Sequence, residues 1–204
     1  MYLEQIPVGS YKNFSYIVAD EKTKDAVIFD PAFDSERLLS ILGKNGFHLR
    51  YIINTHAHLD HIEGNPRMAS ATGAKILMHE SSLAKKDVAV KDGQLLEVGQ
   101  VHLRFVHTPG HSPESMCIVA GGTALLTGDT LFIGECGRVD LPGGDADALY
   151  DSFQKLRSLD PSLIVYPGHD YGKKKYDTLK EELATNYTLA PRSKEDFVKF
   201  MSEP

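Results

Sequence analysis

Short runs of apolar residues, separated by polar or glycine-rich turns, divide the chain into a series of expected strands. Residues 13–19 and 26–29 flank a polar segment, and this pattern predicts an antiparallel hairpin. The apolar, β-branched run at 49–54 predicts a buried strand. Gly99-Gln100 and Gly121-Gly122 mark the turns of two more hairpins. Further strands are expected at residues 74–78, 93–98, 101–107, 116–120, 123–127 and 163–166.

Apolar residues at helical spacing predict the helices. Ser35 is expected to cap a helix that buries Leu38, Leu39 and Leu42 and ends within residues 43–46. Other helices are expected at residues 62–71, 147–156, 177–187 and 194–201.

Two of these helices carry signals at or near their first turn. Gly64 and Pro66 interrupt the helix expected at 62–71. Ser193 and Asp196 form a capping-box pattern that starts the helix expected at 194–201.

The order of these elements indicates an α/β protein. Strands followed by a helix occur twice, and no short-period repeat or low-complexity linker interrupts the chain. Two strand-rich halves with outer helices suggest a four-layer αβ/βα sandwich, although periodicity alone leaves the topology open. We expect one domain over residues 1–204, with about 188–204 forming a C-terminal helical tail.

Composition and charge narrow the classes of partner. Of the 204 residues, 42% are hydrophobic and 25% charged, which is typical of a globular protein, and a net charge of -6 argues against binding nucleic acid. The basic cluster Lys173-Lys174-Lys175 is either a solvated turn or a rim that attracts an anionic substrate. No secretory signal or bilayer-spanning run is visible, so we expect a cytoplasmic protein without a membrane partner. Cys117 and Cys136 are too few for a disulfide scaffold.

Candidate metal-ligating side chains are concentrated directly after the strand expected at 49–54. His56, His58, Asp60 and His61 fall within six consecutive positions there. Grouping so many protonatable side chains is costly without a counter-ion, whereas neutral imidazole and ionised carboxylate are natural ligands of a divalent cation. We therefore expect a metal site at this strand end, where α/β folds place their chemistry.

Three more candidate ligands follow other expected strands. His111, Asp129 and His169 each come shortly after a strand and beside glycine or proline. The full candidate set is His56, His58, Asp60, His61, His111, Asp129 and His169. Nitrogen and oxygen donors without thiolate favour a reactive zinc, iron or manganese site over a closed structural one.

The remaining candidates are expected to be structural. His48, His79 and His102 lie in ordinary strand or helix-edge contexts, and His107 is expected to pack beside the site rather than act in it. Cys136 is interpreted as a packed small residue rather than a reactive thiol.

Four motifs in order carry a family resemblance. Residues 55–61 (T-H-A-H-L-D-H), 108–113 (T-P-G-H-S-P), 128–132 (G-D-T-L-F) and 166–171 (Y-P-G-H-D-Y) resemble the metallo-β-lactamase superfamily. The resemblance extends from the N-terminal hairpin to about Tyr187. It implies an αββα sandwich with metals at one edge between the two sheets.

Within the superfamily, the chain is most similar to the glyoxalase II and persulfide dioxygenase branch. Resemblance to two-metal members implies one metal on His56, His58 and His111 and another on Asp60, His61 and His169, with Asp129 bridging them. Resemblance to persulfide dioxygenases implies a single Fe(II) held by His56, His111 and Asp129.

Three segments favour the dioxygenases. Residues 136–140 (C-G-R-V-D), 169–171 (H-D-Y) and the tail at 195–201 are similar to theirs, and the chain stops 35 residues after His169, whereas long glyoxalase II enzymes add a helical domain that binds glutathione. Two features depart from this pattern. Leu59 stands where the dioxygenases carry alanine, and residues 141–145 resemble short hydrolases equally well.

The favoured hypothesis is therefore a persulfide dioxygenase that uses mononuclear Fe(II) to oxidise a glutathione-type persulfide to sulfite. Asp60, Arg138 and Tyr171 are the candidate catalytic residues; Arg138 and Tyr171 would line the substrate side, with Arg138 pairing a carboxylate of the substrate.

The alternative is a glyoxalase II-like thioester hydrolase with two Zn(II) or mixed zinc and iron. A non-catalytic metal-binding protein on the same fold is the third hypothesis. The sequence leaves open which thiol carries the substrate. The family resemblance makes a homodimer plausible.

Overall fold

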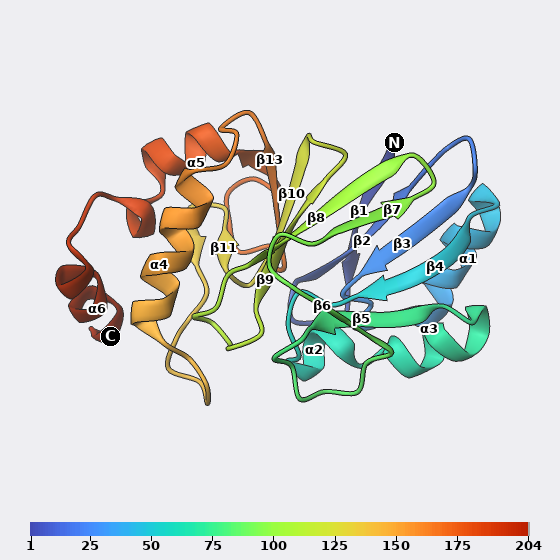
Figure 1. The fold of residues 1–204 in the computed structure, drawn as a ribbon, viewed down its shortest axis with the longest axis horizontal. Helices are drawn as coiled ribbons and strands as arrows, with labels where there is room; N and C mark the ends of the chain where they lie inside the picture. Colours follow the sequence, from blue (N-terminus) through green and yellow to red (C-terminus); the bar gives the residue numbers. More distant parts are fainter. Residues whose placement is uncertain (204) are drawn as a thin grey trace.

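Two six-stranded sheets packed face to face form the centre of the computed structural model, which describes residues 1–203 (Figure 1). The first sheet has the order β1-β2-β3-β4-β5-β6. Its strands are β1 (Tyr2–Val8), β2 (Asn13–Ala19), β3 (Asp25–Phe29), β4 (His48–Ile53), β5 (Lys75–His79) and β6 (Val88–Val90). The first three strands are antiparallel, which confirms the predicted hairpin, and β3 to β6 are parallel.

The second sheet has the order β14-β13-β10-β9-β8-β7. Its strands are β7 (Leu95–Val98), β8 (Val101–His107), β9 (Met116–Ala120), β10 (Ala124–Gly128), β13 (Ile164–Pro167) and β14 (Asp177–Thr178). Both predicted hairpins, β7-β8 and β9-β10, are present, and β10 pairs parallel with β13. A small ribbon of β11 (Leu131–Phe132) and β12 (Glu135–Cys136) follows β10.

Helices cover the outer faces of the two sheets (Figure 1). On the first sheet lie α1 (Ser35–Asn45), α2 (Leu59–Ile62) and α3 (Asn65–Thr72); on the second lie α4 (Ala146–Arg157), α5 (Leu179–Thr185) and α6 (Lys194–Ser202), with the short helix η1 (Tyr187–Leu189). This arrangement confirms the predicted four-layer sandwich.

Three apolar clusters hold the layers together, because each sheet buries both of its faces. Phe14 and Phe29 of the first sheet meet Phe105 and Ile118 of the second in the central cluster. The outer clusters pack helices onto the sheets. Leu38, Leu42 and Met68 contribute to one; Leu149, Phe153, Leu179 and Phe197 contribute to the other.

Several predicted boundaries were wrong. Ser35 is the first residue of α1 and not its cap; Asp34 precedes it in a left-handed conformation without a capping hydrogen bond from its side chain. The helix predicted at 62–71 is two helices, since Gly64 separates α2 from α3 and Pro66 occupies the first turn of α3. The helix predicted at 177–187 begins only at Leu179, after β14.

The predicted start of the last helix is confirmed. The hydroxyl of Ser193 accepts a hydrogen bond from the backbone N–H of Asp196 at 3.1 Å.

The carboxyl ends of β4, β8, β10 and β13 meet at one edge of the sandwich. Backbone hydrogen bonds join the two sheets there: Phe14 donates to Gly168 at 2.8 Å, and Met116 donates to Thr55 at 2.9 Å. The loops after these four strands are therefore held close together.

Candidate metal centre

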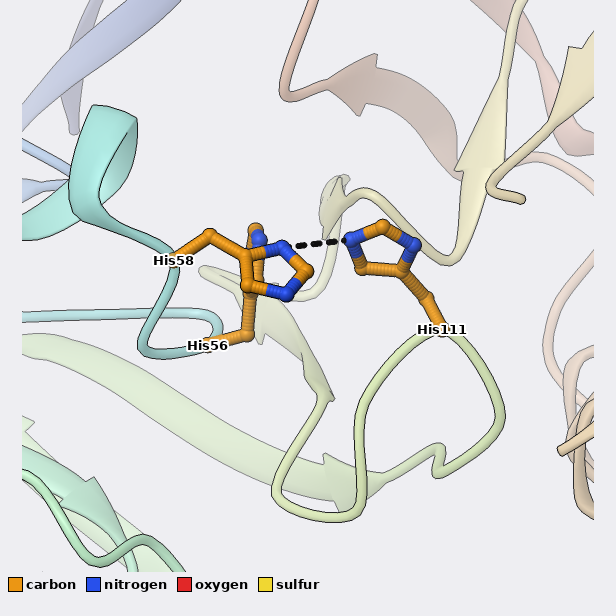
Figure 2. Close-up of side chains that lie close together, drawn as sticks. All are labelled: His56, His58 and His111. Carbon is orange, nitrogen blue, oxygen red and sulfur yellow. Dashed lines mark hydrogen bonds between the residues drawn. The ribbon is translucent and has the colours of Figure 1, made fainter. Parts of the chain in front are cut away.

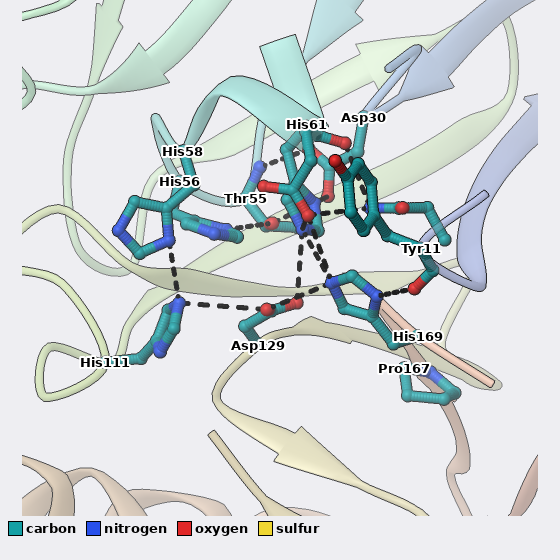
Figure 3. A network of polar contacts seen from close by, with 12 residues as sticks. Tyr11, Asp30, Thr55, His56, His58, His61, His111, Asp129, Pro167 and His169 are labelled. Carbon is teal, nitrogen blue, oxygen red and sulfur yellow. Dashed lines mark hydrogen bonds and ion pairs between the residues drawn. The ribbon is translucent and has the colours of Figure 1, made fainter. Parts of the chain in front are cut away.

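All seven predicted ligands lie together at this edge. Figure 3 labels His56, His58, His61, His111, Asp129 and His169. The seven residues form three overlapping groups, in each of which the donor atoms lie within 4.8 Å of one another. The groups are His56, His58 and His111; His56, His61 and Asp129; and Asp60, His61 and His169. Sequence reasoning thus found the members of the cluster.

The first group joins the two halves of the molecule (Figure 2). His56 and His58 follow β4, and His111 comes from the loop after β8. His58 Nδ1 lies 2.9 Å from His111 Nε2, and the ring of His56 lies edge-on to both others. Three imidazole nitrogens therefore face one point.

The other triad contains His61, whose ring centroid lies 4.1 Å from that of His56 (Figure 3). His61 Nε2 is 3.2 Å from His169 Nε2, and Asp60 Oδ2 is 3.7 Å from the former and 3.5 Å from the latter. Asp60 and His61 belong to α2, while His169 follows β13, so this group also spans both sheets.

Asp129 lies between the two triads. Its Oδ1 is 3.4 Å from His61 Nε2, and its Oδ2 is 3.3 Å from His169 Nε2 and 3.7 Å from His111 Nε2 (Figure 3). Gly128, in the left-handed region at φ 50°, turns the chain at the end of β10 and presents this carboxylate to both triads.

Hydrogen bonds fix four of the histidines by the nitrogen that faces away from the centre. His111 Nδ1 donates to the Arg138 carbonyl at 2.8 Å, and His169 Nδ1 donates to the Tyr11 carbonyl at 2.9 Å. His61 Nδ1 donates to Asp30 at 3.1 Å, and His56 Nδ1 lies 3.1 Å from the hydroxyl of Thr55. With the proton on Nδ1, the lone pair of each Nε2 points into the centre, as metal ligation requires.

Two buried atoms at the centre fit a cation. His56 Nε2 and Asp129 Oδ1 have no hydrogen-bond partner among the described residues, although unpaired buried polar atoms are costly. A divalent cation would satisfy both. The donor set of imidazole nitrogens and carboxylate oxygens, with no thiolate, suits zinc, iron or manganese.

Burial and charge set the protonation of these groups. Burial lowers the pKa of His56 well below its ordinary value and also lowers the pKa of His58. For His61 burial acts in the same direction, but the carboxylates of Asp129 and Asp30 outweigh it and raise the pKa to about 9. The neighbouring His61 and His169 hold the pKa of Asp129 well below its usual range in spite of its burial. A metal would replace the protons that now balance this carboxylate.

Sequence reasoning missed Asp30. This buried carboxylate accepts hydrogen bonds from the backbone and hydroxyl of Thr55, at 2.8 and 2.7 Å, and from His61 Nδ1. It therefore orients the loop that carries the first four ligands. The signal that could have found it is an acidic residue directly after strand β3, the same pattern that identified Asp129.

Glycines let the loops approach closely. A Cβ on Gly168 would lie 2.2 Å from Asp129 Oδ1, and a Cβ on Gly137 would lie 1.8 Å from the Asp129 carbonyl oxygen. Both contacts are impossible for any other residue without movement of the carboxylate or its backbone.

A cavity of about 530 Å³ opens over the centre. It is lined by Tyr11, Phe33, His58, Leu59, Asp60, Glu63, His111, Asp129, Arg138, Leu141, His169 and Tyr171. The structure thus brings the three candidate catalytic residues to the same cavity. The ring of Tyr171 stacks on His169, with centroids 4.8 Å apart. Arg138 forms an ion pair with Asp140 instead of standing free for a substrate carboxylate.

The other singled-out residues lie outside the centre. His107 stacks on His79, and His48 and His102 are exposed. Cys136 is buried, and burial raises the pKa of its thiol to about 12, so it is a packed residue. Lys173 and Lys174 line a neighbouring hollow that meets the cavity at Tyr171.

Within residues 1–203, no helix combines the length and apolar character needed to cross a membrane.

Known proteins resemble the chain over most of its length. The sequence profile of the Metallo-beta-lactamase superfamily matches residues 9–169. A hydroxyacylglutathione hydrolase of Polaromonas sp. is 39% identical over 179 residues, which cover 84% of this chain and 67% of the relative. The human mitochondrial persulfide dioxygenase ETHE1 is 34% identical over 192 residues, 92% of this chain and 75% of the relative.

The fold agrees with these matches. The crystal structure of ETHE1 from Myxococcus xanthus has a TM-score of 0.93 and 31% sequence identity, and the alignment covers 100% of this chain and 92% of that chain. The profile match includes every strand end that carries one of the seven clustered side chains. The protein therefore belongs to the metallo-beta-lactamase superfamily, with relatives named as dioxygenases and as hydrolases.

Proposed function

We propose that the protein is a persulfide dioxygenase, which oxidises the terminal sulfur of a small-thiol persulfide of the glutathione type to sulfite. The observation that carries the proposal is the similarity to the ETHE1 structure over the whole chain, at a TM-score of 0.93. In the overall reaction one persulfide, one dioxygen and one water give the free thiol, sulfite and two protons.

His56, His111 and Asp129 would hold a single Fe(II). Two histidines and one carboxylate are the ligand set of non-haem iron oxygenases, which leaves open positions on the metal. When bound, the iron would supply the redox chemistry that joins oxygen to sulfur. The buried Nε2 of His56 and Oδ1 of Asp129, which lack hydrogen-bond partners among the described residues, support this assignment.

The other polar residues would position these ligands and move protons. His61 and His169 flank the Asp129 carboxylate and would fix its charge and orientation. His58 Nδ1 lies 2.9 Å from His111 Nε2, and His58 would orient that ligand. Asp60 is partly exposed at the cavity wall and accepts a hydrogen bond from Asn13 at 3.1 Å. It would accept the proton released by the water that completes sulfite formation. Tyr171 and Arg138 would form the substrate side of the cavity.

A two-metal thioester hydrolase is the second candidate. Two triads on either side of Asp129 favour it, as does the 39% identity to a hydroxyacylglutathione hydrolase. In that reaction His56, His58 and His111 would hold one metal, Asp60, His61 and His169 the other, and Asp129 would bridge them. The two metals would supply an activated water and stabilise the oxyanion.

Metal content and oxygen uptake distinguish the two reactions. The protein, purified without added metal, is analysed for iron and zinc and then given glutathione persulfide or a glutathione thioester. About one iron per chain with oxygen consumption supports the dioxygenase. Two zincs with thioester cleavage and no oxygen uptake would refute it.

Asp129→Ala should abolish whichever activity is found. Asp151→Ala is the control, because Asp151 is exposed on α4 and pairs with Lys194. Full turnover in the Asp129 variant would place the reaction elsewhere.

A further inference from the structure

Large apolar side chains gather at the mouth of the cavity over the metal centre. Tyr11, Leu59 and Tyr171 are among the exposed large hydrophobic residues, and all three line this cavity together with Phe33 and Leu141. Leu59 is 70% exposed. Single exposed apolar residues are ordinary, but several around one concave site indicate a surface that a ligand covers. Tyr11, Phe33, Leu59 and Leu141 are called the apolar rim below.

The apolar rim is held in place by its neighbours. The rings of Tyr11 and Phe33 lie 6.2 Å apart, and the Phe33 ring covers Gly9, where a Cβ would lie 2.2 Å from it. The carbonyl of Tyr11 accepts the hydrogen bond from His169 Nδ1. This side of the rim is therefore preformed, which lowers the entropic cost of binding.

Helix α2 adds a charge to the rim. Leu59 is the first residue of α2 and Glu63 is its C-cap; the two are four residues apart, so they share one face, and both line the cavity. Within residues 1–203 the Glu63 carboxylate makes no ion pair or side-chain hydrogen bond, and it is exposed. It is available to a ligand.

In the part of the chain that the structure describes, the lining of the cavity holds no unpaired arginine or lysine that could balance Glu63. Arg138 is the one arginine or lysine among the described residues that line the cavity, and Asp140 accepts hydrogen bonds from two of its nitrogens. Lys173 and Lys174 lie beyond Tyr171 in the neighbouring hollow, where Lys174 pairs with Asp177. Within residues 1–203, Glu63 is therefore a side-chain charge at the mouth that no arginine or lysine of the cavity lining balances.

We infer that the site recognises its thiol carrier through a protonated amine that pairs with Glu63 and through an apolar portion that packs against Leu59 and Phe33. The inference deepens the proposed function, because it rests on a small-thiol compound occupying this cavity. Its substrate class is the persulfide of an aminothiol or of a small peptide with a free amine.

Binding of two matched thioethers tests the inference without any turnover. The probes are 2-(hexylthio)ethylamine and 3-(hexylthio)propanoate, which share the apolar chain and sulfur and differ in charge. Isothermal titration calorimetry of the metal-loaded protein should show the amine binding about three- to fivefold more tightly, the size expected for one exposed ion pair. The preference should shrink as salt is raised.

Two variants, each with a matched control, test which residues recognise the amine and the apolar chain of the probes. Glu63→Gln should remove the preference for the amine, while Glu195→Gln, an exposed acid on α6, should keep it. Leu59→Ala should weaken both probes about fivefold through lost apolar contact, while Leu83→Ala, which is fully exposed elsewhere, should weaken neither.

The outcomes separate this inference from the proposed reaction. Tighter binding of the carboxylate probe, or an amine preference unchanged in Glu63→Gln, would overturn the inference. Neither probe is a persulfide or a thioester, so failed oxygen uptake would refute the dioxygenase and leave the binding result standing.

Discussion

The imidazole rings of His79 and His107 stack with centroids 3.7 Å apart and planes 7° apart, and this contact joins the end of β5 to the end of β8. His107 Nε2 donates to the carbonyl of Pro113 at 2.8 Å, and the hydroxyl of Ser81 lies 3.3 Å from the same oxygen. The Pro113 loop carries His111. The stacked pair therefore fastens one arm of the metal centre to the other sheet.

Stability should depend on the protonation of His79. Burial and the neighbouring His107 lower the pKa of His79, while Glu80 and Asp92 oppose the shift and Lys155 adds to it. The folded protein thus favours neutral His79, and this stabilisation is present above the ordinary pKa of 6.5 and is lost as the pH falls below it. In urea unfolding, the stability difference between wild type and His79→Gln should shrink from pH 8 to pH 5.5. A difference that grows on acidification would contradict this account; the exposed His102→Gln is the control.

Asp30→Asn should weaken metal binding more than it disturbs the backbone. Asparagine tolerates the left-handed conformation at this position, where φ is 46°. The variant loses charge-assisted bonds to Thr55 and His61, so we expect about 2 kcal/mol less stability and ~10- to 100-fold weaker metal binding. Metal titration and urea unfolding measure the two effects. Asp34→Asn, at a matching left-handed position outside the centre, should bind metal normally.

Removal of the metal should lower the melting temperature substantially. The ligands come from the loop after β4 in one sheet and from the loops after β8, β10 and β13 in the other, so bound metal would link both halves. A ligand present at about 1,000 times its Kd stabilises by about 4 kcal/mol, which corresponds to roughly 10 °C for a chain of this size. Calorimetry before and after chelation, and after metal is restored, measures the shift. His111→Gln should show a much smaller response to the chelator.

Gly168→Ala should destroy activity while the fold persists. The added Cβ would meet Asp129 Oδ1 at 2.2 Å and His61 Cε1 at 3.0 Å, which forces the carboxylate out of position. We expect at least about a 100-fold loss of turnover, since a small misplacement of a reacting group costs this much. Gly43→Ala in α1, where a Cβ meets nothing within 4 Å, should retain turnover. Normal turnover of the Gly168 variant would show that Asp129 tolerates displacement.

The sequence predicted the parts whose pattern is local. Strand β4 and the two later hairpins follow from continuous apolar runs and glycine turns, and the ligands follow from polar residues placed directly after strands. Strand β1 was missed because Glu4, Gln5 and Pro7 break its alternation, although pairing with β2 holds it in the sheet. Strand β6 has only three residues, and its place is set by β5.

The parts of the site that escaped prediction depend on distant contacts. Asp30 could be recognised as a partner of His61 only once β3 and β4 were known to be parallel neighbours. The pairing of Arg138 with Asp140, and the shared face of Leu59 and Glu63 over the cavity, likewise require the folded loop and helix α2. Tertiary placement, and not residue type, decided these roles.

The backbone bonds from Phe14 to Gly168 and from Met116 to Thr55 bear on how such a protein could diversify. Each lies within two residues of a candidate metal ligand, so an inherited change that loosens either bond would shift the clustered side chains of both sheets at once. The side chains of Leu59 and Leu141 take no part in these two hydrogen bonds and line the mouth of the cavity. New substrate preferences should therefore arise among descendants by substitution of side chains at the cavity mouth. The candidate metal ligands at the base of the cavity should be inherited unchanged.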